Sequence, residues 1–275
     1  MSGTLYLVGT PIGNLEDLSP RAKRVLSDVD FIAAEDTRVT RKLLTHFDIH
    51  TPLVSYHEHN RASQGEAVLA RLLAGEDAAL VTDAGMPAIS DPGEDLVRLC
   101  RERGVAVVSV PGPSAVVTAL AMSGMDCGRF CFEGFLSVNK PARRAHLDAL
   151  KGEKRTMVFY EAPHKLRATL DDLLAAFGDR EIALVKELTK IHESVERLSL
   201  SQAVARFEAE PPRGEYVLVV AGAPEQAEKA LPLEEAVALA LSYAADGMPA
   251  AKAARRAAAE TGCARGEIYK AIAQN

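Results

Sequence analysis

Short runs of apolar and β-branched residues alternate along most of the chain with longer segments in which apolar residues recur at helical spacing. The first run, at 5–8, precedes a predicted helix at 20–28, for which Ser19 supplies the N-cap and Pro20 the first position. Further strands are predicted at 31–34, 53–55, 78–81 and 105–110, with helices at 61–73 and 94–103 between them. This alternation is typical of βαβ units in a mostly parallel sheet.

A second alternating series begins near Gly128 and is followed by a stretch of different composition. Its apolar runs predict strands at 130–135, 156–160, 181–187 and 215–222. Beyond Pro232 the chain is rich in alanine and shows only the helical pattern. The pattern therefore predicts an α/β protein of three domains: α/β domains at 1–115 and 116–228, and a small helical domain at 229–275.

The composition is that of a globular protein. The chain has 275 residues, of which 48% are hydrophobic and 25% are charged, and its formal net charge is -6. No apolar run approaches the ~20 residues of a membrane span, and the N-terminal MSGTLYLVGTP lacks the basic start and long apolar stretch of a signal peptide. We therefore expect a cytoplasmic protein without membrane contact, in which any binding of nucleic acid depends on a local cationic patch.

The cysteine and histidine spacings do not form a metal-binding pattern. In the cytoplasm the four cysteines, Cys100, Cys127, Cys131 and Cys263, are expected to be reduced thiols. The spacing in CGRFC suits a zinc site, but no second Cys or His pair stands at ligand spacing. The HEH triplet at 57–59 is not the HExxH pattern of a zinc enzyme. The sequence therefore predicts no bound metal.

The segment TDAGMPAISDPG, at 82–93, directly follows the strand predicted at 78–81. In an open parallel sheet, ligands bind outside the carboxyl ends of the strands, where this segment lies. Gly85 and Gly93 permit backbone conformations and close approaches that a Cβ would block, and two prolines hold the segment in shape. The alternative is a tight strand-to-helix connection capped by Asp91, but twelve residues exceed the ~5 of a median connection.

Three other turn-rich segments follow predicted strands. They are VGTPIGN at 8–14, VPGPSA at 110–115, which opens a helix at Ser114, and FYEAPH at 159–164. The glycines of the first are not spaced as GxGxxG, and no acidic residue ends the second strand, so a dinucleotide-binding Rossmann domain is disfavoured. Each segment alone could be only a turn, but the four together indicate a single ligand site.

A family resemblance runs through these segments. The motifs that carry it are VGTPIGNLEDLSPRA, AEDTRVTRKLL, SYHEHN, TDAGMPAISDPG, VPGPSA, FYEAPHKL, VKELTKIHE and GEYVLVVAG, in this order. They resemble the ribosomal RNA small-subunit methyltransferase I family of the tetrapyrrole-methylase superfamily, over nearly the whole chain. The resemblance implies two α/β domains with S-adenosylmethionine (AdoMet) bound between them, a homodimer, and methylation of the ribose 2'-oxygen of a decoding-centre cytidine in 16S rRNA.

The same resemblance implies the cofactor contacts, most of them through the backbone. The residues that it places against AdoMet are Pro11, Asp83, Ala84, Gly85, Ala88, Ile89, Ser114, Ala115, Glu161 and Leu188. The superfamily often has glycine where this chain has Leu188, so that position departs from the pattern.

Candidates for the substrate side lie in the segments specific to this branch, AEDTR and YHEHN. A ribose hydroxyl is a poor nucleophile, so a base or a cationic neighbour would help it. The candidates are Glu35, Asp36, Arg38 and His57, together with Glu58 and His59. Asp36 can also cap a helix that begins near Arg38, and HEH can be a solvated loop. The sequence does not identify the base.

The tail from Pro249, PAAKAARRAAAETGCARGEIYKAIAQ, resembles a helix-turn-helix centred on Thr261–Gly262. Lys252, Arg255 and Arg256 fall on its first helix. An alanine-rich surface helix with ordinary solvating charge explains them equally well, and the family resemblance favours RNA contact. Two other functions stay open: a methyltransferase of this fold for a tetrapyrrole or a protein side chain, and a non-catalytic ribosome assembly factor.

Overall fold

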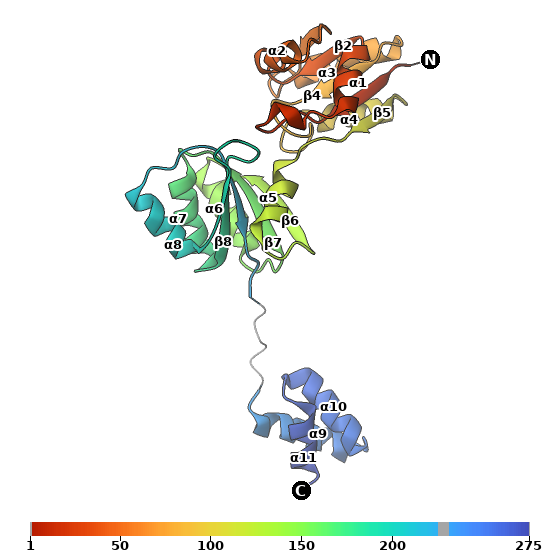
Figure 1. Cartoon of the computed structure of the whole chain (residues 1–275). Helices are drawn as coiled ribbons and strands as arrows, with labels where there is room; N and C mark the ends of the chain where they lie inside the picture. The colour runs from red at the N-terminus through yellow and green to blue at the C-terminus, as the bar shows by residue number, and fades with distance from the viewer. Residues whose placement is uncertain (1, 225–230, 275) are drawn as a thin grey trace. The chain divides into compact units, whose positions relative to one another are not determined.

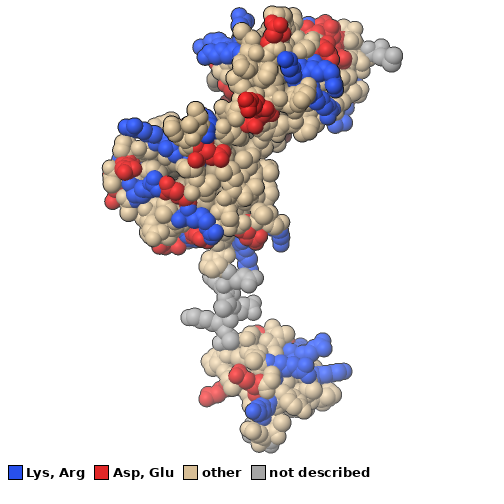
Figure 2. All heavy atoms as spheres, viewed as in Figure 1, with Lys and Arg blue, Asp and Glu red and all other residues tan. Residues whose placement is uncertain are grey.

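The computed structural model describes residues 2–224 and 231–274, which form two compact units, 1–222 and 223–275 (Figure 1). The first unit holds two β-sheets with their helices, and the second holds helices only. The domain boundary predicted at 228 lies outside the described residues, and the one predicted at 115 falls where the first helix after β5 begins. Figure 2 shows Lys and Arg interspersed with Asp and Glu over the visible face of each unit.

The first sheet is parallel, with the strand order β3-β2-β4-β1-β5. Its strands are β1 (Thr4–Val8), β2 (Phe31–Ala34), β3 (Leu53–Ser55), β4 (Ala78–Val81) and β5 (Ala106–Val110). Between them lie η1 (Leu15–Asp17), α1 (Pro20–Asp28), α2 (Thr37–His46), α3 (Arg61–Leu73) and α4 (Glu94–Glu102). Every residue of β2 and β4 is buried, as expected for inner strands covered by helices on both faces. The βαβ pattern predicted for this half is confirmed.

The helix starts of this half follow from local capping chemistry. The Ser19 hydroxyl accepts from the Ala22 N–H at 3.0 Å and caps α1, as predicted. Helix α4 is different, because its N-cap is Gly93 at φ +140° and no side chain caps it. A Cβ on Gly93 would also lie 2.7 Å from Cδ2 of Leu80. The alternative that Asp91 serves as the cap of this helix is therefore wrong.

The second sheet is mixed, with the strand order β6-β7-β10-β8-β9. Its strands are β6 (Phe130–Phe135), β7 (Thr156–Glu161), β8 (Glu181–Lys186), β9 (Ser194–Ser199) and β10 (Tyr216–Val220). Its helices are α5 (Ala115–Ser123), α6 (Lys140–Leu150), α7 (Leu166–Phe177) and α8 (Leu200–Ala209). Only the β6–β7 pair is parallel. The prediction of a mostly parallel sheet fails here because the segment 187–193 is too short for a crossover and forces β8 and β9 into an antiparallel pair.

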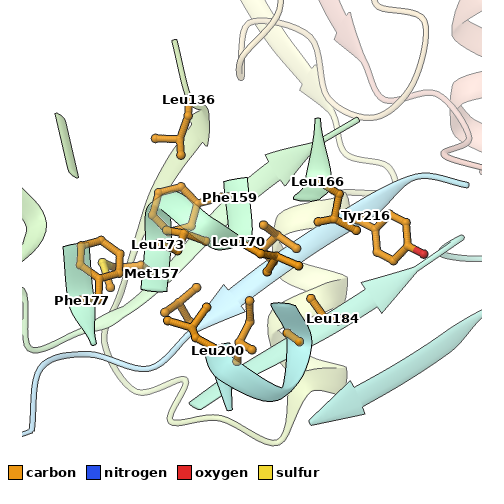
Figure 3. Close-up of a cluster of buried hydrophobic side chains, with 14 of the residues drawn as sticks. Leu136, Met157, Phe159, Leu166, Leu170, Leu173, Phe177, Leu184, Leu200 and Tyr216 are labelled. Carbon is orange, nitrogen blue, oxygen red and sulfur yellow. The ribbon is translucent and has the colours of Figure 1, made fainter. Parts of the chain in front are cut away.

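The core of the second sheet fills both of its faces. On one face, α7 contributes apolar residues at helical spacing (Leu166, Leu170, Leu173 and Phe177), which pack with Met157 and Phe159 of β7 (Figure 3). On the other face, a separate cluster joins α5 to the strands; it includes Val116, Ala119, Leu120, Val158, Ala183, Val185 and Val217. Helix α5 therefore starts at the end of β5 and packs against the second sheet, which links the two halves.

The C-terminal unit is a three-helix assembly of α9 (Leu233–Ala245), α10 (Ala250–Thr261) and α11 (Arg265–Ile272). Its core combines four alanines, Ala236, Ala240, Ala254 and Ala257, with Ile268 and Ile272 of α11. Gly262, at φ +70°, ends α10 in the left-handed region. The turn predicted between two short helices at Thr261–Gly262 is confirmed. None of the helices in the described residues is long and apolar enough to cross a membrane.

The loops after β1 and β5 touch through their backbones. A Cβ on Gly112 would lie 2.9 Å from Cα of Gly9, and one on Gly9 would lie 2.7 Å from Cα of Gly112 and 2.8 Å from Sδ of Met86. Real Cβ atoms do not approach so closely, and backbone atoms cannot swing aside as a side chain can. Both positions therefore require glycine, although neither has a positive φ.

Replacing Gly112 by alanine tests this contact. The new methyl group has to push the β1 and β5 loops apart, so Gly112→Ala is expected to lower the free energy of unfolding by roughly 1–3 kcal/mol, measured by urea denaturation. The matched control is Gly152→Ala, since Gly152 is exposed and nothing lies within 4 Å of its added Cβ. Equal stability of the two variants would contradict the close packing of these loops.

Candidate active-site cleft

A cleft of about 460 Å³ opens in the unit 1–222 between loops of the two sheets. Glu35, after β2, and residues 82–86 and 89–91, after β4, form one wall. The start of α5 and the ends of β7, β8 and β10 form the other. The volume lies within the roughly 300–1,000 Å³ of small-molecule sites, and the cleft sits at the carboxyl ends of the parallel strands as the sequence predicts.

Most of the predicted cofactor positions line this cleft. They are Asp83, Ala84, Gly85, Ile89, Ser114, Ala115, Glu161 and Leu188. Pro11 and Ala88 do not line it. Of the predicted substrate-side residues, only Glu35 lines it, whereas Asp36, Arg38 and His57 do not. The four loops identified from their turn-forming residues therefore meet at one place, but the two branch-specific motifs share only one residue with it.

The segment 82–93 is held to the loop after β1 by a short antiparallel bridge. Thr10 N–H donates to the Gly85 carbonyl at 2.9 Å, and Gly85 N–H donates to the Thr10 carbonyl at 3.1 Å. The Thr10 hydroxyl adds a bond to the Thr82 carbonyl at 3.1 Å. Hydrogen bonds between protein groups therefore fix the segment 82–93 against the loop after β1.

The same segment contains unusual backbone conformations. Ala88 and Ser90 have φ of +68° and +61°, values that are costly for residues with a Cβ and that cluster at functional sites. Gly85 has φ +89°, and a Cβ there would meet Ile12 and the Pro113 carbonyl at ordinary contact distances of 3.6 and 3.7 Å. The unusual backbone conformation expected at Gly85 is therefore confirmed, and the described protein atoms leave ordinary room for a Cβ there.

Carboxylates gather on the first wall of the cleft. Glu35, Asp83 and Asp91 all line it, and the Thr82 hydroxyl donates to Oε2 of Glu35 at 2.6 Å. Burial, followed by the negative charge of Glu35, raises the pKa of Asp91 to about 6. The same two causes raise the pKa of Asp83. This wall therefore favours a cationic ligand, and Asp91 ionises near neutral pH.

Asp91 was not among the predicted site residues. Its segment was singled out from the sequence, but the DPG triplet was weighed only as a helix cap. Because Gly93 takes the cap position, the Asp91 side chain is left to the cleft wall. The sequence could have indicated Asp91 as a site residue, because it is a carboxylate in a loop already assigned to a ligand site.

Asp36 and Arg38 form a local unit at the start of α2. Oδ1 of Asp36 accepts from the Arg38 N–H at 2.8 Å, which makes Asp36 the N-cap of the helix. Its other oxygen pairs with Nη2 of Arg38 at 2.6 Å. The hydrogen bond from the Arg38 side chain is the largest of the effects that hold the pKa of Asp36 well below its usual range. The capping role of Asp36 is confirmed, and so low a pKa makes it a poor proton acceptor.

His57 lies in a turn after β3 and not in the cleft. Its N–H donates to Oδ1 of Asn60 at 2.8 Å, and its ring meets that of His59 edge-on at 5.9 Å. Nδ1 of His57 is buried and has no hydrogen-bond partner among the described residues. His59 is thus the candidate that His57 meets, and neither histidine lines the cleft.

The second wall of the cleft combines aromatic rings with a buried carboxylate. The Tyr160 hydroxyl accepts from the Val116 N–H at 3.1 Å, and its ring meets Phe135 at 5.5 Å, so the ring is fixed against the first turn of α5. Glu161 is only 4% exposed; it accepts from the Ala162 N–H at 2.9 Å and from the Thr169 hydroxyl.

Several lining residues of this wall were not predicted. They are Phe135, Tyr160, Ala162, Pro163, Val185, Tyr216 and Val217. Tyr160, Ala162 and Pro163 belong to FYEAPH, which was recognised as a ligand loop, so the loop carried the signal. Phe135, Val185, Tyr216 and Val217 reach the cleft because of the strand order of the mixed sheet, which the sequence pattern does not reveal.

The two halves meet beside Leu188. A Cβ on Gly13, in the loop after β1, would lie 2.6 Å from the Leu188 carbonyl. Nearby, Nζ of Lys190 pairs with Glu187 at 3.0 Å and with Glu215 at 2.9 Å. These ion pairs fix the loop after β8 to the start of β10, within the second half.

Metal ligands are not grouped in the described residues. No set of three or more His, Cys, Asp or Glu side chains among residues 2–224 and 231–274 is arranged to hold a metal ion.

The sequence matches one protein family over most of its length. Residues 4–204 match the family of tetrapyrrole (corrin/porphyrin) methylases. The ribosomal RNA small subunit methyltransferase I of Synechocystis sp. is 47% identical over 269 residues, which cover 98% of this chain and 96% of that protein. The protein of the same name from Escherichia coli O157:H7 is 45% identical over 271 residues, which cover 98% of this chain and 94% of that protein.

Solved structures share the fold at lower identity. The uroporphyrin-III-C-methyltransferase of Thermus thermophilus aligns with a TM-score of 0.57 and 22% identity, over 80% of this chain and 94% of that chain. A structure of that enzyme complexed with S-adenosylhomocysteine aligns with a TM-score of 0.55 and 20% identity, over 79% of this chain and 97% of that chain. Cobalt precorrin-4 methyltransferase aligns with a TM-score of 0.61 and 16% identity, over 79% of this chain and 94% of that chain. At these identities the likeness concerns the fold alone.

Filling the cleft with a large side chain tests whether AdoMet binds there. Ala115, at the first position of α5, lines the cleft, so Ala115→Trp is expected to weaken AdoMet binding more than about 10-fold by occupying part of its volume. Isothermal titration calorimetry measures the affinity, and thermal unfolding verifies the fold. The control is Ala145→Trp, which places the same side chain at an exposed position of α6. Equal AdoMet affinity of both variants would show that the cofactor binds elsewhere.

Proposed function

Because this chain belongs to the tetrapyrrole methylase family and, within it, to the ribosomal RNA small subunit methyltransferase I family, we infer that it is an AdoMet-dependent rRNA methyltransferase. Its substrate is the small-subunit 16S rRNA, and the acceptor is the ribose 2'-oxygen of a cytidine in the decoding centre. The observation that carries this inference is the meeting of TDAGMPAISDPG, VPGPSA and FYEAPH around one cleft, in a chain that matches these relatives over nearly its full length.

The residues of the cleft fit AdoMet in charge and in shape. The cofactor carries a methyl group on a positively charged sulfur, which makes that methyl group open to attack by an oxygen nucleophile. Glu35, Asp83 and Asp91 give the first wall negative charge suited to a cation. Val185, Leu188 and Val217 offer an apolar surface opposite, suited to a flat ring. Small residues at the loops leave room for backbone contacts.

The chain's own contribution to the chemistry is alignment and removal of a proton. Methyl transfer is an in-line displacement, so a rigid cleft that fixes both reactants supplies much of the rate. The 2'-hydroxyl proton needs an acceptor, and Asp91 lines the cleft with a pKa raised to about 6, close to neutral pH. Glu35 is bound by the Thr82 hydroxyl, and its charge keeps the pKa of Asp91 raised. We assign Asp91 as the proton acceptor and Glu35 as the group that tunes it.

Partner and location follow from this substrate. A protein that acts on the small ribosomal subunit works in the cytoplasm. We also propose that it acts as a homodimer, as the family resemblance of the sequence implies.

The helices α9–α11 are proposed to touch the RNA, but with fewer free cations than the sequence suggests. Arg256 pairs with Glu260 at 3.0 Å and lies over the Tyr243 ring at 4.4 Å, so it serves the fold of the tail. Lys252 and Arg255 have no ion pair among the described residues. They are the tail's candidates for phosphate contact.

Transfer of labelled methyl groups tests the function directly. The purified protein is expected to move tritium from methyl-labelled AdoMet to the 16S rRNA of 30S particles, and nuclease digestion should release the label as 2'-O-methylcytidine. EDTA should not change the rate, because the described residues hold no metal cluster. Label on a tetrapyrrole or a protein side chain would favour another methyltransferase of this fold. Binding to 30S particles without transfer would favour an assembly factor.

The role of Asp91 predicts a defined pH dependence. Asp91 must be ionised to accept a proton, so the single-turnover rate should fall as the pH drops through about 6 and level off above it. Measured at saturating AdoMet, Asp91→Asn should lower that rate by about 100-fold or more. The loss of one of the first wall's carboxylate charges should also weaken AdoMet binding, which calorimetry measures separately. Glu94→Gln is the control, since Glu94 is an exposed carboxylate three residues away. A wild-type rate and pH profile in Asp91→Asn would show that Asp91 is not the acceptor.

A further inference from the structure

Helix α2 starts at the edge of the cleft. Glu35 lines the cleft, Asp36 caps the helix, and Thr37 is its first residue. At ~1.5 Å per residue, the helix Thr37–His46 extends ~15 Å from this edge. A strand of RNA whose ribose enters the cleft has its neighbouring phosphates within reach of such an element.

One face of α2 is made of cationic and polar side chains. The face consists of Arg38, Arg41, Lys42, Thr45 and His46, which are all exposed and line one surface hollow. They recur at the i, i+3, i+4, i+7, i+8 spacing of a single helix face. The opposite side holds the buried residues Thr40, Leu43 and Leu44. In Figure 2, blue side chains project from the upper left of the molecule, where Figure 1 places α2.

The charges on this face are not neutralised by neighbours. Arg38 is paired with Asp36, but Arg41 and Lys42 make no ion pair with any part of the chain that the structure describes. The first turn of α2 contains no acidic residue. Cations near a helix N-terminus oppose the helix dipole, and like charges three and four residues apart repel each other. The arrangement lowers the stability of the free helix, and a bound polyanion would relieve it.

We propose that this face of α2 binds backbone phosphates of the RNA strand whose ribose enters the cleft, with Arg41 and Lys42 as the direct contacts. The proposal rests on the proposed function, because it takes RNA as the substrate. It gives the protein, whose net charge is -6, the local cationic patch that its binding to RNA requires. The cationic face of α2 lies beside the carboxylate wall of the cleft. It therefore holds the RNA at the cleft edge, while the carboxylate wall faces the cofactor. Phosphate contacts of this kind position the strand and leave its sequence unread.

The test is removal of the two unpaired charges. Arg41→Gln/Lys42→Gln keeps unbranched polar side chains and helix propensity while it removes both charges. Filter binding to 30S particles across a salt series measures the RNA contact without any need for catalysis. We expect weaker binding at low salt and a log–log salt slope smaller by about 2, since each lost phosphate contact changes the slope by about 1. In the methyl-transfer assay KM should rise while the single-turnover rate at saturating 30S stays unchanged. AdoMet affinity should also stay unchanged.

Two control variants make the result specific. Lys140→Gln/Arg144→Gln removes two exposed cations from α6, and Lys252→Gln/Arg255→Gln removes two from α10. If the α2 variant keeps the wild-type salt slope of 30S binding, the proposal is overturned, whatever the slope of the α10 variant. An equal change in the α2 and α6 variants would also overturn it, because the effect would then be one of net charge. If wild-type protein binds 30S particles with the α2-dependent slope but transfers no methyl group, the proposed function fails and the phosphate contact stands.

Discussion

The site depends on backbone-to-backbone packing of the loops that follow β1, β4 and β5. Gly9 and Gly112 bring two of these loops into contact, and the Thr10–Gly85 bridge ties the third to the first. None of these contacts involves a long side chain, so little conformational freedom is left to lose when a ligand arrives. These loops form one side of the cleft. Helix α5 begins at the end of the β5 loop and packs against the second sheet, so it fixes the second sheet relative to these loops. A rigid cleft suits a reaction whose main requirement is alignment.

Electrostatics divides the surroundings of the cleft by sign. Carboxylates line its first wall, and their mutual repulsion, together with burial, raises the pKa values of Asp83 and Asp91. The Asp36–Arg38 unit stands at the boundary, and beyond it α2 carries two unpaired cations, Arg41 and Lys42. A cationic cofactor and an anionic RNA strand are thus attracted to adjacent but different places. Salt screens the exposed charges of α2 more strongly than the partly buried carboxylates, so cofactor and RNA binding should differ in their salt dependence.

Much of the fold was predictable because the first half follows local rules. Buried runs such as Phe31–Ala34 and Ala78–Val81 match strands to the residue, and the Ser19–Pro20 pair marks a helix start. The second sheet was harder. The strand Ser194–Ser199 carries Glu196 and Arg197 at its centre and is partly exposed at a sheet edge, so its pattern lacks the apolar signal.

The cofactor loops were found through residues whose chemistry is local, whereas the rest of the site was not. Glycine, proline and small residues mark a turn wherever it lies in the fold, so Gly85 and Ser114 were recognisable. The side chains of Phe135, Tyr216 and Val217 come to the cleft only because β6, β7, β10 and β8 take that order in a mixed sheet. Asp36 and Arg38 do not line the cleft, and a carboxylate that caps its own helix and pairs with a nearby arginine looks the same in sequence as one that faces a ligand.

The most direct test of this account is a crystal structure of the protein with S-adenosylhomocysteine. The account predicts the ligand between the two halves of the unit 1–222, in contact with Ala84, Ala115 and Leu188, with the Thr10–Gly85 bridge intact. The carboxylates of Glu35 and Asp91 should stand on the wall that faces the ligand's sulfur. A ligand bound outside this cleft, or a segment 82–93 without the bridge to Thr10, would contradict the claim that these loops form the cofactor site.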